Sequence, residues 1–171
     1  KLVTGKGVRS INFEGGIVGS VELSDGSSLR TDFYVSALPF DVLLEVLPRD
    51  VAKGAFFAGI SELTSSPIIG VHLWYDRPIM SQDFVAFLDS PVQWVFNRSW
   101  ITGDDGPGQY LTVSLSGAWE FWPMSKQALE ELFVPELARV LPKARTAVVE
   151  RFVVVKEQQA TFQSLPGKTA N

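Results

Sequence analysis

Apolar positions alternate with polar ones in the first part of the chain, which predicts β-structure. The runs Val8–Glu14 and Ile17–Leu23 flank Gly15-Gly16, a dipeptide that tolerates the positive φ angles of a tight hairpin turn. After a second turn the chain returns through Ser28–Thr31. The run Phe33–Leu38 is apolar nearly throughout, which is typical of a strand buried on both faces. The pattern therefore predicts a β-meander that leads into a buried sheet.

Helical spacing replaces this alternation at three places. Apolar residues recur at i, i+3, i+4 and i+7 in Phe40–Leu47, and Asp50 is suited to cap a second helix that includes Ala52–Ile60. A third apolar stripe begins after the capping residue Ser125 and reaches Leu141. Pro135 lies inside this stripe and predicts a kink or a break.

Strand patterns fill the rest of the chain. They are expected at Pro67–Tyr75, Phe84–Leu88, Gln93–Asn97, Tyr110–Leu115 and Ala147–Lys156. From Gln158 onward the sequence becomes polar and rich in Gly and Pro, so no closing element is expected there. The predicted fold class is α+β, with a mainly antiparallel sheet, flanking helices and an N-terminal β-meander.

Composition excludes several classes of function. The 171 residues include 15 basic and 19 acidic side chains, so no excess of positive charge favours nucleic-acid binding. With no Cys and one His, neither a thiol nucleophile nor a Cys- or His-rich metal site is expected. No apolar run approaches the ~20 residues of a membrane-spanning helix, and no signal peptide is visible.

Aromatic residues are the main candidates for a binding site. The sequence contains five Trp and twelve Phe, and several of them fall on separate predicted strands. They form either an ordinary aromatic core or the wall of a pocket for a large apolar ligand. His72, in an apolar strand, is either a satisfied interior residue or part of that pocket. The predicted substrate-binding residues are His72, Trp74, Trp94, Phe96 and Trp119.

No Ser/His/Asp arrangement, metal cluster or acid/base pair is evident, so no catalytic residue is assigned. If the domain belongs to an enzyme, a cofactor must supply the chemistry.

The order of segments resembles the middle of FAD-dependent amine oxidase/phytoene desaturase-type flavoproteins. In that family the pattern V-x-x-I … G-x-V-x-x-V-x-L-x-D-G … A-D-x-V-V-x-A-x-P leads from the FAD domain into the substrate domain. Similar segments here are Val8–Ile11, Gly16–Gly26 and Thr31–Pro39. Three later segments resemble squalene-associated FAD-dependent desaturases, which are hydroxysqualene dehydroxylases: Ser65–Pro78, Gln93–Arg98 and Val155–Phe162.

This resemblance implies FAD as the cofactor and a division of the chain into parts. Residues 1–38 are expected to be a strip of the FAD-binding domain, residues 39–165 the substrate-binding domain, and residues 166–171 a tail leading back to the FAD domain. The strand–G-x-G-x-x-G–helix motif that seats the FAD pyrophosphate is absent here. The main binding motifs are therefore expected outside this chain, as in a fragment of a longer protein. The cofactor contacts expected within it are Val8, Ala37, Leu38 and Pro39.

The implied function is the substrate-binding part of an FAD-dependent oxidoreductase that acts on a hydrophobic isoprenoid. The specific version is conversion of hydroxysqualene to squalene in hopanoid biosynthesis; phytoene-like desaturation and a protoporphyrinogen-oxidase-like activity are alternatives within the enzymes. A stand-alone module that binds an apolar ligand or a protein, without redox activity, is the alternative of another class. The fragment is expected to be inactive alone and to dimerise through an exposed strand edge. A cytoplasmic location is expected for the full-length protein, with peripheral contact to the inner membrane.

Overall fold

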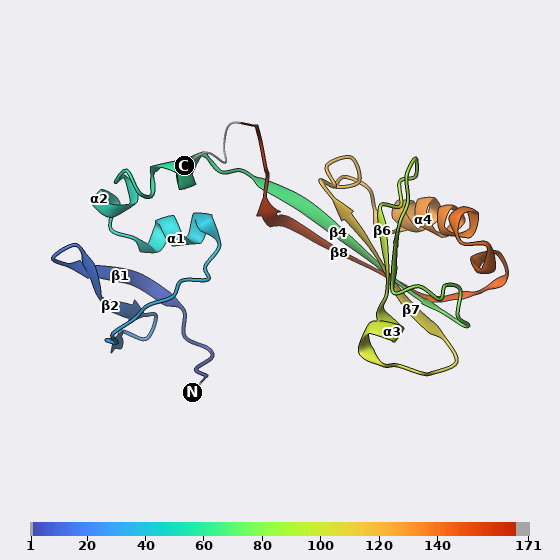
Figure 1. Ribbon diagram of the computed structural model, residues 1–171, viewed down its shortest axis with the longest axis horizontal. Helices are drawn as coiled ribbons and strands as arrows, with labels where there is room; N and C mark the ends of the chain where they lie inside the picture. The colour runs from blue at the N-terminus through green and yellow to red at the C-terminus, as the bar shows by residue number, and fades with distance from the viewer. Residues whose placement is uncertain (1, 167–171) are drawn as a thin grey trace. The chain divides into compact units, whose positions relative to one another are not determined.

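The computed structural model describes residues 2–166, and the chain forms two compact units. The first unit contains the chain up to Thr64 together with the residues from Ser164 on, and the second is Ser65–Gln163. Figure 1 shows the elements of each unit. The mixed α+β class with antiparallel sheets agrees with the sequence prediction.

The first unit begins with the predicted meander. Strands β1 (Val8–Glu14), β2 (Ile17–Leu23) and β3 (Ser28–Leu29) form an antiparallel sheet in the order β1-β2-β3. Gly15 and Gly16 have φ angles of 62° and 86°, the left-handed region that glycine occupies without steric cost. The hairpin expected from this dipeptide is therefore confirmed.

The expected buried strand at Phe33–Leu38 is wrong. Within the described residues this segment belongs to no sheet, and Phe33 and Val35 are 86% and 95% exposed. A strand needs a neighbour to pair its backbone groups, and β3 ends already at Leu29. The Tyr34 hydroxyl instead fastens the segment, since it accepts a hydrogen bond from Thr31 N at 3.1 Å and lies 3.1 Å from the carbonyl oxygen of Gly19.

Short helices complete this unit. Helix α1 (Phe40–Val46) matches its prediction closely, whereas the helix expected over Ala52–Ile60 is replaced by α2 (Arg49–Ala52) and the 3₁₀-helix η1 (Ala58–Glu62). Gly54 lies in the turn between them, where its N–H bonds to the carbonyl of Val51.

The helices change the division expected from the sequence. Val46 and Leu47 pack with Ile11 of β1, so the first compact unit extends to Thr64 rather than ending at residue 38. The assignment of each part to an FAD or a substrate domain remains a prediction. The expected tail at 166–171 lies, apart from Pro166, outside the described residues.

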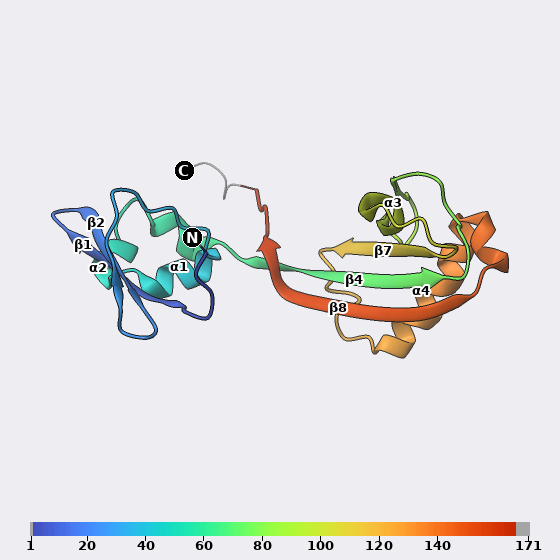
Figure 2. The same ribbon diagram turned by 90° about the horizontal axis from the view of Figure 1, so that it is seen from below.

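The second unit is a five-stranded antiparallel sheet with the strand order β5-β6-β7-β4-β8. Its strands are β4 (Ser65–Tyr75), β5 (Phe84–Ala86), β6 (Trp94–Asn97), β7 (Gln109–Ser116) and β8 (Val149–Phe162). Its helices are α3 (Arg98–Thr102), α4 (Lys126–Val140) and the 3₁₀-helix η2 (Pro142–Thr146). Helices α3 and α4 lie on opposite sides of the sheet in both views (Figures 1 and 2).

Helix α4 covers one face of this sheet. Its residues Leu129, Phe133 and Leu137 are fully buried, and they share a hydrophobic core with alternate residues of the strands, including Val71 and Val113. The Ser125 side chain caps the helix by accepting from Ala128 N, as expected.

Two expectations about this unit need correction. Pro135 does not break α4, because it lies on the exposed side, where water can hydrogen-bond the carbonyl that lost its partner. The chain also does not lose its structure after Gln158, since β8 continues to Phe162 by pairing with Ser65 and Ser66 at the start of β4. Helix α3 was not expected; its signal is Asn97, whose side chain caps it by accepting from Trp100 N.

Candidate functional site

The face of the second unit's sheet opposite α4 is the candidate substrate site, and we call it the open face. It is formed by the positions that alternate with the core residues on each strand. The register aligns Phe84, Phe96, Thr112, His72 and Val153 in one row across all five strands. The neighbouring row on one side consists of Ala86, Trp94, Ser114, Gly70 and Val155. Four of the five predicted substrate-binding residues thus lie on one surface.

A stack of three side chains lies at the end of this face nearest the C-terminus of β4. The rings of Trp74 and Tyr110 are parallel within 5°, with centroids 4.4 Å apart, and the guanidinium carbon of Arg151 lies 4.6 Å from the Trp74 ring. The three residues are direct cross-strand neighbours on β8, β4 and β7. Stacking and cation–π attraction therefore hold these three side chains against one another.

A second aromatic group occupies β5 and β6. Trp94 and Phe96 lie with ring centroids 6.2 Å apart, and Phe84 lies 6.1 and 6.2 Å from them. Phe84 and Trp94 remain 57% and 42% exposed. Large aromatic side chains that stay this exposed together are typical of a surface that binds something apolar.

His72 lies between the two aromatic groups. Its Nδ1 is 2.8 Å from the Tyr110 hydroxyl and 3.2 Å from the Thr112 hydroxyl. Partial burial, together with the positive charge of Arg98, lowers the pKa of His72 below its ordinary value. The lowered pKa favours the neutral imidazole, and two hydroxyl groups lie at its Nδ1.

The fifth predicted residue, Trp119, lies apart from the strand rows. It follows Gly117 in the turn after β7, is 53% exposed, and makes none of the ring contacts that join the other aromatic side chains of the open face. Its role in substrate binding remains a prediction.

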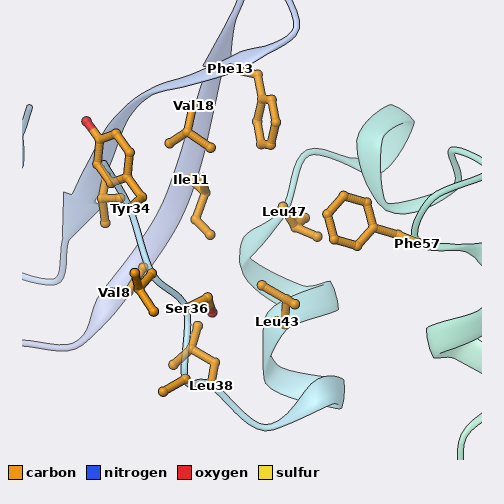
Figure 3. Close-up of a pocket in the computed structure, with 13 residues that line it drawn as sticks. Val8, Ile11, Phe13, Val18, Tyr34, Ser36, Leu38, Leu43, Leu47 and Phe57 are labelled. Atoms are coloured by element: carbon orange, nitrogen blue, oxygen red, sulfur yellow. The ribbon is translucent and has the colours of Figure 1, made fainter. Parts of the chain in front are cut away.

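The predicted cofactor contacts lie in the first unit. Val8, Ala37 and Leu38 line an apolar cavity of about 440 Å³, whereas Pro39 is the residue that precedes α1. Figure 3 shows the cavity between the meander, the segment with Tyr34, and three residues from the helical part of the unit: Leu43 of α1, Leu47 directly after α1, and Phe57 directly before η1. The complete lining is Val8, Ile11, Phe13, Val18, Val21, Tyr34, Val35, Ser36, Ala37, Leu38, Leu43, Leu47 and Phe57.

This cavity suits only part of a flavin cofactor. Its lining contains no Lys or Arg, so no cationic side chain is present to neutralise a diphosphate. Apolar side chains with two hydroxyl groups, from Tyr34 and Ser36, instead suit an uncharged ring. The residues therefore fit an uncharged ring of the cofactor, and the cofactor contacts expected at Val8, Ala37, Leu38 and Pro39 remain predictions.

Several residues of the open face were missed by sequence reasoning. Phe84, Tyr110, Thr112 and Arg151 become part of it only through strand pairing. The alternation of Tyr110 and Thr112 with the apolar Leu111 and Val113 is the signal that would have found two of them. Phe84 and Arg151 carry no comparable local signal.

Residues 2–166 contain no group of three or more potential metal ligands, and none of the helices there has the length and apolar character needed to cross a membrane.

The chain belongs to the family of flavin containing amine oxidoreductases, which matches residues 1–170. FAD is accordingly the cofactor of the full-length protein. More particularly, the chain is 29% identical over 163 residues to the 15-cis-phytoene desaturase of Solanum lycopersicum, covering 90% of this chain and 28% of that protein. The chain thus spans under a third of the length of this curated relative.

Solved structures share the fold. An oxidoreductase from Methanosarcina mazei superposes with a TM-score of 0.67 at 18% identity, over 90% of this chain and 37% of that one. Putrescine oxidase bound to putrescine superposes with a TM-score of 0.63 at 16% identity, over 86% and 33% of the two chains.

Proposed function

We propose that this chain is the substrate-binding part of an FAD-dependent oxidoreductase that acts on a long isoprenoid. The observation that carries the proposal is the open face of a sheet whose other face is covered by α4. Two aromatic groups lie on the open face; Phe84 and Trp94 are exposed there, and the other rings are partly exposed. Such a surface offers a large apolar area with few polar groups, as an isoprenoid chain requires. Family membership adds the flavin, which exchanges a hydride with the substrate when bound.

Two reactions are compatible with this site. The later sequence segments resemble hydroxysqualene dehydroxylases, in which a C–OH bond is replaced by C–H; this reduction consumes a hydride and a proton and releases water. The matched relatives are instead 15-cis-phytoene desaturases, and desaturation removes two hydrogens from neighbouring carbons and reduces the flavin. In either case the residues of this chain bind and orient the apolar chain.

The test uses the full-length protein that contains this chain. It is purified, examined for flavin by its visible absorbance, and incubated anaerobically with hydroxysqualene plus a reductant, or with phytoene plus a quinone acceptor. Turnover of either isoprenoid supports the proposal. A flavin-free protein, or a flavoprotein that converts neither, contradicts it; ligand binding without flavin would favour the stand-alone binding module.

A matched pair of variants tests the site itself. Trp94→Ala removes an exposed ring of the open face, whereas Phe56→Ala removes a ring of the first unit that is 88% exposed. We expect Trp94→Ala to raise KM about tenfold, because a buried aromatic contact with an apolar chain is lost. Phe56→Ala should leave KM within about twofold. Equal effects of the two substitutions would remove the open face from the proposal.

The remaining expectations belong to the same proposal. The isolated chain is inactive without the rest of the FAD site and pairs with a second copy through a sheet edge. The full-length protein is cytoplasmic and contacts the inner membrane peripherally to collect its substrate. Light scattering of the isolated chain tests its pairing, and vesicle sedimentation of the full-length protein tests its contact with the membrane.

A further inference from the structure

The open face contains one polar group that its aromatic surroundings do not explain. His72 Nδ1 is held by the hydroxyls of Tyr110 and Thr112, at 2.8 and 3.2 Å. The other ring nitrogen, Nε2, lies over Gly70: a Cβ built on that glycine would come within 3.1 Å of Nε2. Because residue 70 is glycine, no Cβ occupies the space next to Nε2.

The residue next to Nε2 is small, and apolar side chains lie further along the same row of the open face. Gly70 pairs with Ser114 on β7 and with Val155 on β8, and Trp94 follows Ser114 across β6. A ligand lying on this row would contact Trp94 on one side and Val155, 53% exposed, on the other. The nitrogen therefore projects into a path that suits an apolar chain.

In a neutral imidazole one ring nitrogen donates a hydrogen bond and the other accepts one. If Nδ1 accepts from a hydroxyl, Nε2 carries the proton and donates; if Nδ1 donates, Nε2 accepts. An alcohol oxygen can meet either demand because it both donates and accepts. A hydrocarbon lying on the same path meets neither, and it would cover a polar atom without a partner.

Resting on the proposed function, we infer that His72 Nε2 is the point at which the open face binds a single hydroxyl oxygen of its substrate, which makes the substrate an isoprenoid alcohol rather than a hydrocarbon. Tyr110 and Thr112 are positioning residues, since they hold the opposite edge of the ring. Gly70 provides the space for the bound oxygen.

Binding of a matched pair of ligands tests this inference. Farnesol and farnesene have the same isoprenoid length and differ chiefly in the hydroxyl. Their dissociation constants are measured by quenching of tryptophan fluorescence, with the flavin-loaded full-length protein and with this chain. We expect farnesol to bind about three- to tenfold more tightly, the ratio that one hydrogen bond supplies. Equal affinities would overturn the inference while leaving the apolar face intact; absence of binding by both ligands would contradict the proposed function itself.

Three substitutions assign the preference to His72. His72→Leu should reduce the ratio of the two affinities to about one, mainly by weakening farnesol, whereas His72→Gln should restore part of it. Gly70→Ala, which crowds Nε2, should lower the ratio with His72 still present. Thr146→Ala removes an exposed hydroxyl in η2, outside the open face; it is the control and should leave the ratio unchanged. A preference for farnesol that survives in His72→Leu would overturn the inference.

Nitrogen NMR gives a readout that does not depend on folding differences between variants. This chain contains one His, so the tag-free chain labelled with ¹⁵N-histidine gives the two imidazole nitrogens of His72 alone. Saturating farnesol should shift the Nε2 resonance by more than the Nδ1 resonance, and farnesene should not. An Nε2 resonance that stays in place at saturation would contradict the assignment.

Discussion

The two compact units of this chain place their apolar residues differently. In Ser65–Gln163, strands and α4 enclose an extended core in which Phe133, Leu129 and Val113 are fully buried. In the first unit, the described residues bury only Ile11, Val46 and Leu47 in a common cluster. Apolar residues are present there too, but they line a cavity or face solvent.

This difference separates two uses of hydrophobic sequence. The second unit buries its apolar side chains internally and offers one sheet face for a ligand. The first unit leaves Phe33 and Val35 exposed, next to a cavity of about 440 Å³ whose lining includes Ala37 and Leu38. Exposed apolar surface of this kind marks places where a ligand or another surface binds. We therefore expect the second unit to be the more stable of the two.

All five tryptophans lie in the second unit, which allows the comparison to be measured. Tryptophan fluorescence reports the unfolding of that unit, and far-ultraviolet circular dichroism reports both. In urea we expect the circular dichroism transition to begin at lower concentration than the fluorescence transition. Coincident transitions would show that the two units unfold as one.

The largest effect is expected for Phe133→Ala. The ring is fully buried and lies 5.6 Å from that of Phe121, centroid to centroid. Its removal should lower the free energy of unfolding of the second unit by about 3–5 kcal/mol, through lost burial and the cavity left behind. Urea titration followed by tryptophan fluorescence measures this. Phe56→Ala, at a site that is 88% exposed, is the control and should change it by less than about 0.5 kcal/mol.

Gln109→Ala tests the polar part of the same core. The buried Gln109 amide accepts from the backbone N–H groups of Ile79 and Met80 and donates to the carbonyl of Met80. Truncation leaves these groups without partners, which should cost about 2–3 kcal/mol by the same titration.

Gln93→Ala is the matched control for this substitution. The Gln93 side chain also bonds a backbone N–H and a backbone carbonyl, both of Ser116, but in an exposed position where water replaces it. It should cost less than about 1 kcal/mol. Equal costs for the two glutamines would contradict the view that burial sets the difference.

A substitution in the first unit tests whether that unit unfolds separately from the second. Leu47 is one of its few buried residues and also borders the cavity. Leu47→Ala should destabilise this unit by about 2 kcal/mol, the low end for such truncations, because part of the side chain already faces empty space. The effect should appear in circular dichroism and leave the tryptophan transition in place. A shift of both transitions would show that the units are coupled.

Sequence patterns predicted most of this fold where local rules suffice. The Gly15-Gly16 hairpin, the core alternation of β4 and the Ser125 cap of α4 all depend on neighbours in the sequence, and the structure has them. The strand expected at Phe33–Leu38 is wrong because an apolar run does not specify a neighbouring strand with which the segment could pair. The expectation of no regular element after Gln158 was wrong because the polar residues up to Phe162 pair with β4 through their backbone, which a pattern of side chains does not show.

The candidate site was predictable to the extent that it follows strand alternation. His72 and Trp74 share a face by simple alternation, but their partners Tyr110 and Thr112 come from a strand more than thirty residues away. Register decides which side chain meets which, and a sequence without its pairing does not specify register. The stack of Arg151 on Trp74 was out of reach for the same reason.

The smallest effect concerns the acid stability of the second unit. Glu136 on α4 accepts hydrogen bonds from the guanidinium of Arg139 and from the Ser90 hydroxyl, at 2.6–2.8 Å, and these lower its pKa from 4.5 to about 2. Because the folded state binds the proton more weakly than the unfolded state, the stabilisation is complete above about pH 5. It is lost as the pH falls from about 4.5 towards 2.

Glu136→Gln isolates this contribution. At pH 7 the substitution should lower the Tm followed by tryptophan fluorescence by a few degrees at most, since Arg139 is exposed and solvent screens the pair. The difference in Tm between the two proteins should shrink between pH 4.5 and 2 and vanish at the lower end. Glu130→Gln, on the same helix, is the matched control and should show no such convergence. A difference that stays constant across this range would mean that Glu136 stabilises α4 by packing rather than by charge.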